Sequence, residues 1–151
     1  MEISIRPYAT SDFEIVTSIW HDAWDSTGIP ALVPLEKHVA LETLRERLPK
    51  EIDGGWSVHV ATADGRVAGF VAISPSHLHQ LFVAPRVQSR GIGKRLLDFA
   101  KAQQTGGFTL TTPIVSRAVK FYEREGLVAE STSVHPRYGH ERVHFRWTPK
   151  S

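Results

Sequence analysis

The sequence predicts a mixed α/β fold in which helices cover both faces of one sheet. Short apolar runs typical of strands alternate with amphipathic segments typical of helices, and glycine and proline residues separate them. In chain order the expected elements are β-α-α-β-β-β-α-β-α-β-β. We find no internal repeat, low-complexity tract or linker, so a single domain is expected over residues 1–151.

Residue periodicity and turn residues place each element. Strands are expected over residues 2–7, 56–62, 67–74, 77–83, 108–112, 127–134 and 142–147. Helices are expected to begin at a capping box over residues 11–14, to cover residues 35–48, to follow the glycine turn at residues 91–93 as far as about Gln104, and to run from a Ser116 cap to Gly126.

The first half of the chain raises three further expectations. In the first helix a stripe of apolar residues is expected to face the core, while Trp24 could face a pocket instead. Residues 25–34 are expected to form an irregular apolar loop, and Pro49 to end the second helix. The stripe consists of Val16, Ile19, Trp20 and Ala23.

Composition excludes several classes of function. The formal net charge is only +2, which does not favour nucleic acid or a membrane surface as a partner. The absence of cysteine excludes disulfides, thiolate metal sites and a cysteine acyl-enzyme. No run approaches the ~20 apolar residues that span a bilayer, and the N-terminus lacks the apolar stretch of a signal peptide. We therefore expect a cytoplasmic protein.

The most informative stretch covers residues 81–97, Leu-Phe-Val-Ala-Pro-Arg-Val-Gln-Ser-Arg-Gly-Ile-Gly-Lys-Arg-Leu-Leu. An apolar strand is followed by a basic turn that contains Gly91 and Gly93, and an amphipathic helix follows the turn. Such a turn leaves backbone N–H groups unpaired at the positive end of the helix dipole, which predicts a phosphate site. The cations expected around the turn are Arg86, Arg90, Lys94 and Arg95.

Two common phosphate-binding motifs do not fit this stretch. A Walker A loop would require glycine at Gln88 and a hydroxyl residue at Arg95. A dinucleotide fingerprint would require a third glycine at Leu96.

The run from Gln88 to Gly93, with its flanking residues, instead resembles the coenzyme A motif of the GNAT N-acetyltransferase superfamily. Residues 115–127 resemble the family's Asn-x-x-Ala-x-x-Phe-Tyr-x-x-x-Gly-Phe motif, with Val115 in place of the asparagine and Leu127 in place of the last phenylalanine. The order of elements is that of the GNAT fold. The resemblance thus implies a mostly antiparallel seven-stranded sheet and transfer of an acetyl group from acetyl-CoA to an amine.

The resemblance also implies where acetyl-CoA would bind. The pantetheine arm would lie along the strand over residues 77–83 and pair with its main chain, and the pyrophosphate would lie on the N–H groups of residues 88–94. The residues expected to contact the cofactor are Leu81, Phe82, Val83, Gln88, Ser89, Arg90, Gly91, Ile92, Gly93, Lys94, Ser116 and Tyr122.

Three residues are candidates for catalysis. Tyr122 matches the family's general acid, and a phenol with a pKa of about 10 still holds its proton at neutral pH. The Val83 N–H is the candidate oxyanion donor. His79 lies where many relatives have a glutamate and is either a general base or a sheet histidine with a satisfied hydrogen bond. Alternation is expected to place His77, His79, Leu81 and Val83 on one face of the strand.

A metal site is not expected, because His77 and His79 have no obvious third ligand in the sequence. Candidates for binding the acceptor come from this strand and two loops: His77, Trp24, Asp25, Arg137 and Tyr138. An ammonium group could be held by Trp24, Asp25 and Glu36, and a carboxylate or phosphate by Arg137 and Tyr138. The alternative for each of these residues is a surface charge or an aromatic residue that only packs.

The function expected is therefore direct transfer, in a ternary complex, to a primary amine of a small molecule or a protein. The alternative is an acyl-CoA-binding sensor or interaction module without turnover, suggested by Val115 and His79. A nucleic-acid binder that uses the cations at residues 86–95 is disfavoured by the total charge. The resemblance is compatible with a homodimer.

Overall fold

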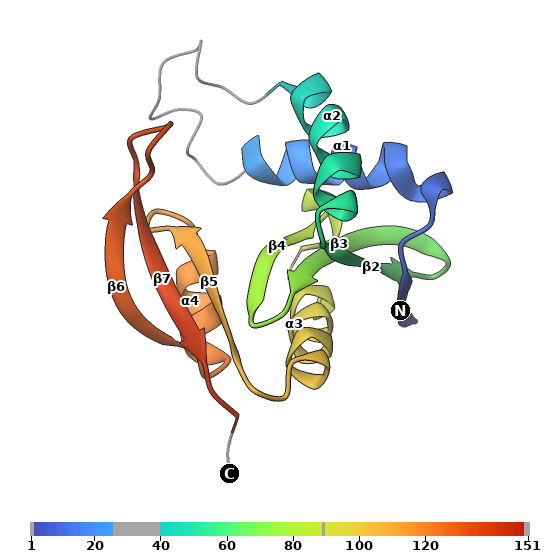
Figure 1. Ribbon diagram of the computed structural model, residues 1–151. Coiled ribbons are helices and arrows are strands. Elements are labelled where there is room, and N and C mark those ends of the chain that lie inside the picture. The colour runs from blue at the N-terminus through green and yellow to red at the C-terminus, as the bar shows by residue number, and fades with distance from the viewer. Residues whose placement is uncertain (1, 26–39, 89, 150–151) are drawn as a thin grey trace.

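The computed structural model describes residues 2–25, 40–88 and 90–149, apart from the side chain of Asp25. Within these ranges, seven strands form one sheet in the order β1-β2-β3-β4-β5-β7-β6 (Figure 1). The strands are β1 (Ile3–Pro7), β2 (Ser57–Ala63), β3 (Arg66–Ser74), β4 (His77–Val83), β5 (Phe108–Pro113), β6 (Val128–Val134) and β7 (Glu141–Trp147). The helices are α1 (Phe13–Asp25), α2 (Leu41–Asp53), α3 (Ile92–Gln103) and α4 (Ala118–Arg124), with short 3-10 helices η1 (Thr10–Asp12) and η4 (Pro85–Val87).

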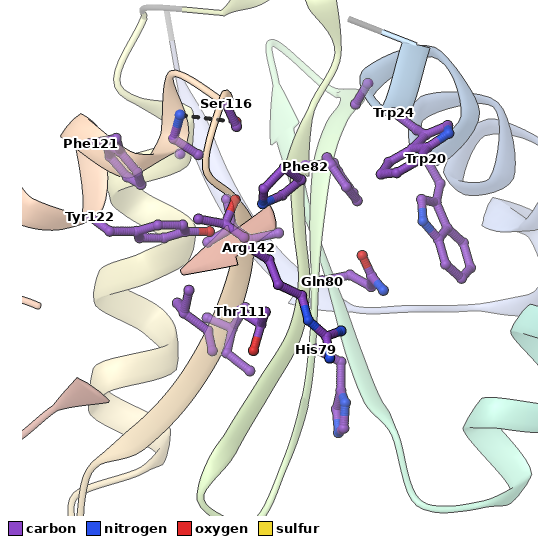
Figure 2. A pocket seen from close by; sticks show the side chains of 18 of the residues that line it. Trp20, Trp24, His79, Gln80, Phe82, Thr111, Ser116, Phe121, Tyr122 and Arg142 are labelled. Carbon is purple, nitrogen blue, oxygen red and sulfur yellow. Dashed lines mark hydrogen bonds between the residues drawn. The ribbon is translucent and has the colours of Figure 1, made fainter. Parts of the chain in front are cut away.

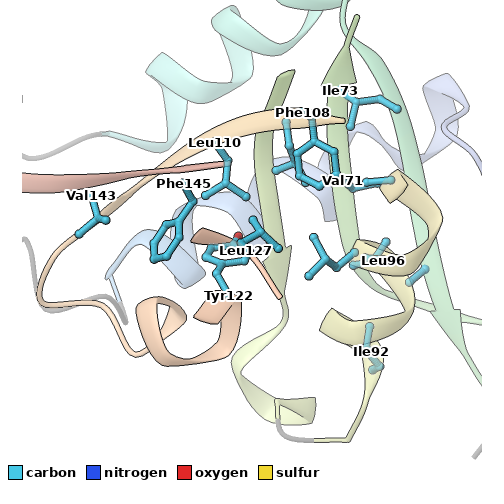
Figure 3. Packing of buried hydrophobic residues seen from close by; sticks show 14 of the residues in the cluster. Val71, Ile73, Ile92, Leu96, Phe108, Leu110, Tyr122, Leu127, Val143 and Phe145 are labelled. Atoms are coloured by element: carbon cyan, nitrogen blue, oxygen red, sulfur yellow. The ribbon is translucent and has the colours of Figure 1, made fainter. Parts of the chain in front are cut away.

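Helices cover both faces of the sheet, as predicted (Figure 1). On one face, α1 and α2 pack against β2 and β3, and the predicted apolar stripe of α1 is buried there. On the other face, α3 and α4 bury the second core, in which Leu96, Tyr122 and Phe145 take part (Figure 3). The predicted order of elements is confirmed.

Strands β4 and β5 are parallel neighbours that meet at one end only. Their ladder contains a single pair, His77 opposite Thr109, and the Thr109 N–H donates to the Ser76 carbonyl at 3.1 Å. All other neighbouring strands pair antiparallel, so the mostly antiparallel sheet is confirmed. Beyond His77 the two strands separate, and no strand of the described residues lies beside this edge of β4.

A β-bulge in β4 corrects the expected alternation along this strand. Ala72 lies opposite Gln80 but Ile73 lies opposite Leu78, so His79 is an extra residue in β4. The side chain of Leu81 packs on the α3 side of the sheet, whereas the His79 ring stacks on Trp56 on the α1 side, with 5.1 Å between ring centroids. His77 lies against His79 on the same α1 side. The prediction that His77 and His79 share a face with Leu81 and Val83 is therefore wrong, because a bulge reverses the alternation beyond it.

The start of α1 also differs from the prediction. No capping box forms over residues 11–14: the chain enters α1 through η1, and the Ala9 N–H donates to Asp12 Oδ2 at 2.8 Å. Arg6 donates two further hydrogen bonds to the same carboxylate, at 2.8 and 2.9 Å. The ion pair with Arg6 of β1 fixes Asp12 at this position, and the capping-box spacing within residues 11–14 does not include such a pair.

Helix α2 continues beyond Pro49 to Asp53, so the expected stop at this proline is wrong. Leu44 and Leu48 are buried, and Ile52 packs against the same core. These residues recur every fourth position and form one apolar stripe that crosses the proline. Burial of this stripe offsets the hydrogen bond that a proline cannot donate. Of the predicted loop over residues 25–34, only Asp25 is described, and residues 35–39 lie outside the described ranges.

Replacing Asp12 with asparagine is expected to destabilise the fold in a pH-dependent way. The hydrogen bond from Arg6 holds the pKa of Asp12 below its usual 3.8. Loss of this charge-assisted pairing should cost about 1–3 kcal/mol at pH 7, measured by denaturant unfolding. The difference should be complete above about pH 4 and shrink at lower pH, as the native carboxylate is protonated.

Asp22→Asn is the matched control, because the Asp22 side chain is 65% exposed on α1, the helix that follows Asp12. It should change the free energy of unfolding by no more than about 0.5 kcal/mol. Equal losses in the two variants would show that the Arg6–Asp12 pair does not stabilise the fold.

Candidate functional site

A cavity of about 1080 Å³ lies between the diverging strands β4 and β5 (Figure 2). Every residue of β4 lines it, together with parts of α1, α2, β5, α4 and the β6–β7 hairpin. The cavity therefore extends from the start of α3 and α4 on one side of the sheet to the aromatic residues of α1 and the hairpin on the other.

The start of α3 is suited to an anion. Gly91 is the N-cap residue, with a φ of 84°, and no side chain of the described residues caps the first turn. Its left-handed backbone disfavours a side chain, and the N–H groups of the first turn are left for a ligand. Gly93 lines the cavity, while the Ile92 side chain is buried in the core, so only its main chain could contact a ligand. Ser89 lies outside the described residues.

The main chain of β4 offers a second set of hydrogen-bonding groups. The Ala84 N–H donates to the Ala68 carbonyl of β3 at 2.8 Å. Main-chain groups of successive residues point to opposite edges of a strand, so those of Val83 and Leu81 face the edge from which β5 has diverged. An extended ligand could therefore pair with this edge as a strand does.

The cations near the glycine turn were expected to surround a phosphate, but most of them pair with groups of the protein. Lys94 is paired with Glu125 at 2.8 Å and Asp98 at 3.5 Å, and Arg95 donates to the Ile3 carbonyl at 3.1 Å. Arg86 donates to the Val67 carbonyl at 3.4 Å, and neither Arg90 nor Lys94 lines the cavity. The cations that do line this side are Arg117, Lys120 and Arg124.

These three cations were not predicted, because the prediction considered only the cations next to the glycine turn. Their spacing of three and four residues was a usable signal, since it places them on one side of a helix. Arg117 also hydrogen-bonds Gln88 Oε1, and Gln88 Nε2 donates to the Val83 carbonyl at 3.2 Å. Gln88 therefore connects the end of β4 to the start of α4.

Helix α4 brings Ser116 and Tyr122 to the cavity. The Ala118 N–H donates to Ser116 Oγ at 3.1 Å. The N-cap residue of α4 is nevertheless Arg117, one residue later than predicted, and its side chain makes no capping hydrogen bond. Tyr122 is 5% exposed, packs against Phe145 and points its hydroxyl into the cavity (Figure 2). Burial raises the pKa of Tyr122 above its usual value of 10, so its proton is retained at neutral and moderately alkaline pH. Val115, at the position of the family's asparagine, lines the cavity and is half exposed.

His79 lines the cavity on the α1 side of the sheet. Its Nε2 lies 2.6 Å from Ser74 Oγ, and its ring is 4.5 Å from that of His77. Burial, followed by the smaller effects of His77 and Arg47, lowers the pKa of His79 to about 4. The imidazole is therefore neutral at pH 7. His77 hydrogen-bonds Thr109 Oγ1 through Nδ1 at 2.9 Å.

The remaining acceptor candidates are only partly brought together. Trp24 and Tyr138 both line the cavity, and their ring centroids are 5.6 Å apart. Arg137 is exposed outside the cavity, with its guanidinium 5.7 Å from the Tyr138 ring. Asp25 ends α1, its side chain is not described, and Glu36 lies outside the described ranges.

Four cavity residues were not singled out from the sequence: Arg47, Trp56, Thr111 and Arg142. His135 and His140, which also line the cavity, lie in the loop over residues 135–140 that was predicted as a candidate for binding the acceptor. Val143 and Phe145 are buried on the α3 side, so strand alternation already placed Arg142 and His144 on the opposite face. Among the described residues, no group of three or more histidine, aspartate or glutamate side chains could hold a metal ion.

The fold and the cavity together define a GNAT acetyltransferase. The chain matches the family described as "Acetyltransferase (GNAT) domain" over residues 30–148, and it belongs to this family. The predicted family is thereby confirmed. No helix within the described ranges is long and apolar enough to cross a membrane.

Individual relatives agree with this assignment. The chain is 28% identical over 127 residues to the peptidyl-lysine N-acetyltransferase YjaB of Salmonella typhimurium (strain LT2), with 83% of each protein covered. The solution structure of apo-form YjaB from Escherichia coli has a TM-score of 0.76 at 22% identity, covering 99% of this chain and 100% of that one. PaiA N-acetyltransferase from Thermoplasma acidophilum, in complex with coenzyme A, has a TM-score of 0.74 at 20% identity, covering 97% and 100%.

The lowered pKa of His79 can be measured directly. NMR titration of its ring should give a midpoint near pH 4. Arg47→Gln should raise this midpoint, because a nearby positive charge disfavours protonation. Arg45→Gln, on the same helix but paired with Glu14, should not change it. A midpoint at the ordinary value of 6.5 would contradict the buried position of the ring.

Proposed function

We propose that this chain is an acetyl-CoA-dependent N-acetyltransferase that transfers the acetyl group directly to a primary amine of a small molecule or a protein. The observation that carries the proposal is the divergence of β4 from β5, which opens one cavity to both faces of the sheet. The thioester can then approach from the α3 side and the amine from the α1 side. Family membership supports acetyl-CoA as the cosubstrate.

The residues present fit this cosubstrate at three points. The uncapped first turn of α3 would bind the pyrophosphate, with Gly91 allowing close approach. Arg117 and Lys120 would add positive charge on the α4 side. The exposed edge of β4 at Leu81 and Val83 would pair with the amides of the pantetheine arm. Direct transfer is also consistent with a chain that has no cysteine to carry an acyl group.

In this proposal the amine nitrogen attacks the thioester carbonyl, a C–N bond forms and the C–S bond breaks. The Val83 N–H would donate to the oxygen that gains negative charge during attack. Tyr122 would give its proton to the departing thiolate, a role that its place in the cavity supports. Its raised pKa keeps the phenol protonated at neutral pH and also makes it a weaker acid.

His79 would accept the proton that the amine loses, directly or through water. The role requires the tautomer in which Nε2–H donates to Ser74 Oγ, because Nδ1 then keeps its lone pair. The low pKa of about 4 keeps this lone pair free at neutral pH but makes the imidazole a weak base.

Binding of acetyl-CoA should depend on the turn before α3. In calorimetry, Gly91→Glu should abolish micromolar binding, because a carboxylate would occupy the anion site and the left-handed backbone disfavours any side chain. Gly106→Glu is the matched control at the far end of the same helix, where a side chain would meet open space. No binding by the unaltered protein would refute the proposed function, and binding without acetylation of any amine would favour the sensor.

Tyr122→Phe should lower kcat by about 100- to 10,000-fold, because the leaving thiolate loses its acid. Binding of acetyl-CoA should persist, since the ring and its packing remain. Tyr8→Phe, at a half-buried tyrosine outside the cavity, should retain full activity. An unchanged maximal rate for Tyr122→Phe across pH 6–9 would exclude the acid role.

A further inference from the structure

The described lining of the cavity contains no carboxylate. Aspartate and glutamate are absent from it, whereas it includes five cationic side chains. Three of them, Arg117, Lys120 and Arg124, lie on the α4 side that we assign to the phosphates of the cosubstrate. The other two, Arg47 and Arg142, lie on the side assigned to the acceptor.

Of these two, Arg47 is already engaged. Its guanidinium lies 5.2 Å from the Trp20 ring and 5.6 Å from the Trp56 ring, and its Nε is 4.0 Å from Glu51. Arg142 differs, because no carboxylate of the described residues lies within ion-pair distance of it. It is half-buried and extends from β7 into the cavity (Figure 2).

A chain of hydrogen bonds holds the Arg142 side chain in place. Its Nε donates to Ser133 Oγ at 2.9 Å, and Ser133 Oγ lies 2.6 Å from His144 Nε2. His144 Nδ1 in turn lies 3.1 Å from Thr111 Oγ1, on β5. The serine hydroxyl accepts from the arginine, so its own proton is directed to the histidine. The two terminal nitrogens of Arg142 make no hydrogen bond with any described residue and are left for a ligand.

This arrangement is unfavourable for an acceptor that carries only positive charge. A half-buried guanidinium is costly without a counter-ion, and an ammonium group placed beside it is repelled. An acceptor with its own anionic group removes both problems, since guanidinium binds a carboxylate or phosphate in a bidentate manner. The same positive charge lowers the pKa of the bound amine and so favours the neutral, nucleophilic form.

We infer that the acceptor is a small amine that carries a carboxylate or phosphate group, and that Arg142 binds this anion. The inference rests on the proposed function and narrows its acceptor. It departs from the lysine side chain of a peptide, which is the acceptor named for the relative YjaB. A lysine side chain brings no anion of its own to the site.

The test is a steady-state comparison of matched acceptors with acetyl-CoA. The panel contains α-amino acids, the amines obtained by removing their carboxylate, their aminophosphonate analogues and a lysine-containing peptide. For the unaltered protein, kcat/KM should be about 10- to 100-fold higher for an anionic acceptor than for its decarboxylated partner, the range expected for a charge-assisted hydrogen bond. The carboxylate and phosphonate arms show which anion fits better.

Arg142→Gln should reduce this ratio toward one, mainly through KM of the anionic acceptor, and Arg142→Lys should restore part of it. Arg146→Gln is the matched control, because Arg146 lies four residues further along the same face of β7, is exposed and is paired with Glu130 at 3.0 Å. It should keep the preference of the unaltered protein.

Three results would overturn the inference. Equal or higher kcat/KM for the decarboxylated amines or the peptide would refute it while leaving the proposed function intact. An unchanged ratio in Arg142→Gln would show that another group sets the preference. No acetylation of any acceptor would refute the inference, and calorimetry with acetyl-CoA on the same preparation would then show whether the proposed function fails as well.

Discussion

The single point of contact between β4 and β5 is the constraint on which the rest of the structure depends. A parallel pair would normally continue along both strands, but here the ladder contains only His77 and Thr109. Three bonds hold that point: the Thr109 N–H to the Ser76 carbonyl, His77 Nδ1 to Thr109 Oγ1, and Gln104 Nε2 to the His77 carbonyl at 3.3 Å. Above this point the strands separate around the cavity, while Phe108 and Leu110 of β5 pack into the core.

The divergence gives the two faces of the sheet different chemistry. On the α3 side, an uncapped helix start and the cations of α4 surround the cavity. On the α1 side, aromatic rings, neutral histidines and Arg142 surround it. Strand β4 lines the cavity between these two sides, so a group bound from one face can react with a group bound from the other. The Tyr122 ring packs in the apolar core and its hydroxyl faces the cavity, and this burial raises its pKa.

Much of this arrangement could be predicted from the sequence. The glycine turn, the flanking strand and the helix after it are contiguous, so their order alone predicts an anion site at the start of α3. Tyr122 and Ser116 could be found for the same reason, since they lie close together in one segment that contains the short helix α4. The positions of the strands were predictable because each has an apolar face and ends at turn residues, such as Asp64-Gly65 between β2 and β3.

The sequence by itself therefore determined the order of elements and the local motifs, because both depend on residues that are neighbours in the chain. Tertiary structure alone decided which face His79 occupies, since a bulge is defined only against the partner strand. It also decided which cations remain free: Lys94 is neutralised by Glu125 at a distance along the chain, whereas Arg142 meets no carboxylate among the described residues. Charge pairing and burial depend on contacts between distant segments, and no local pattern encodes them.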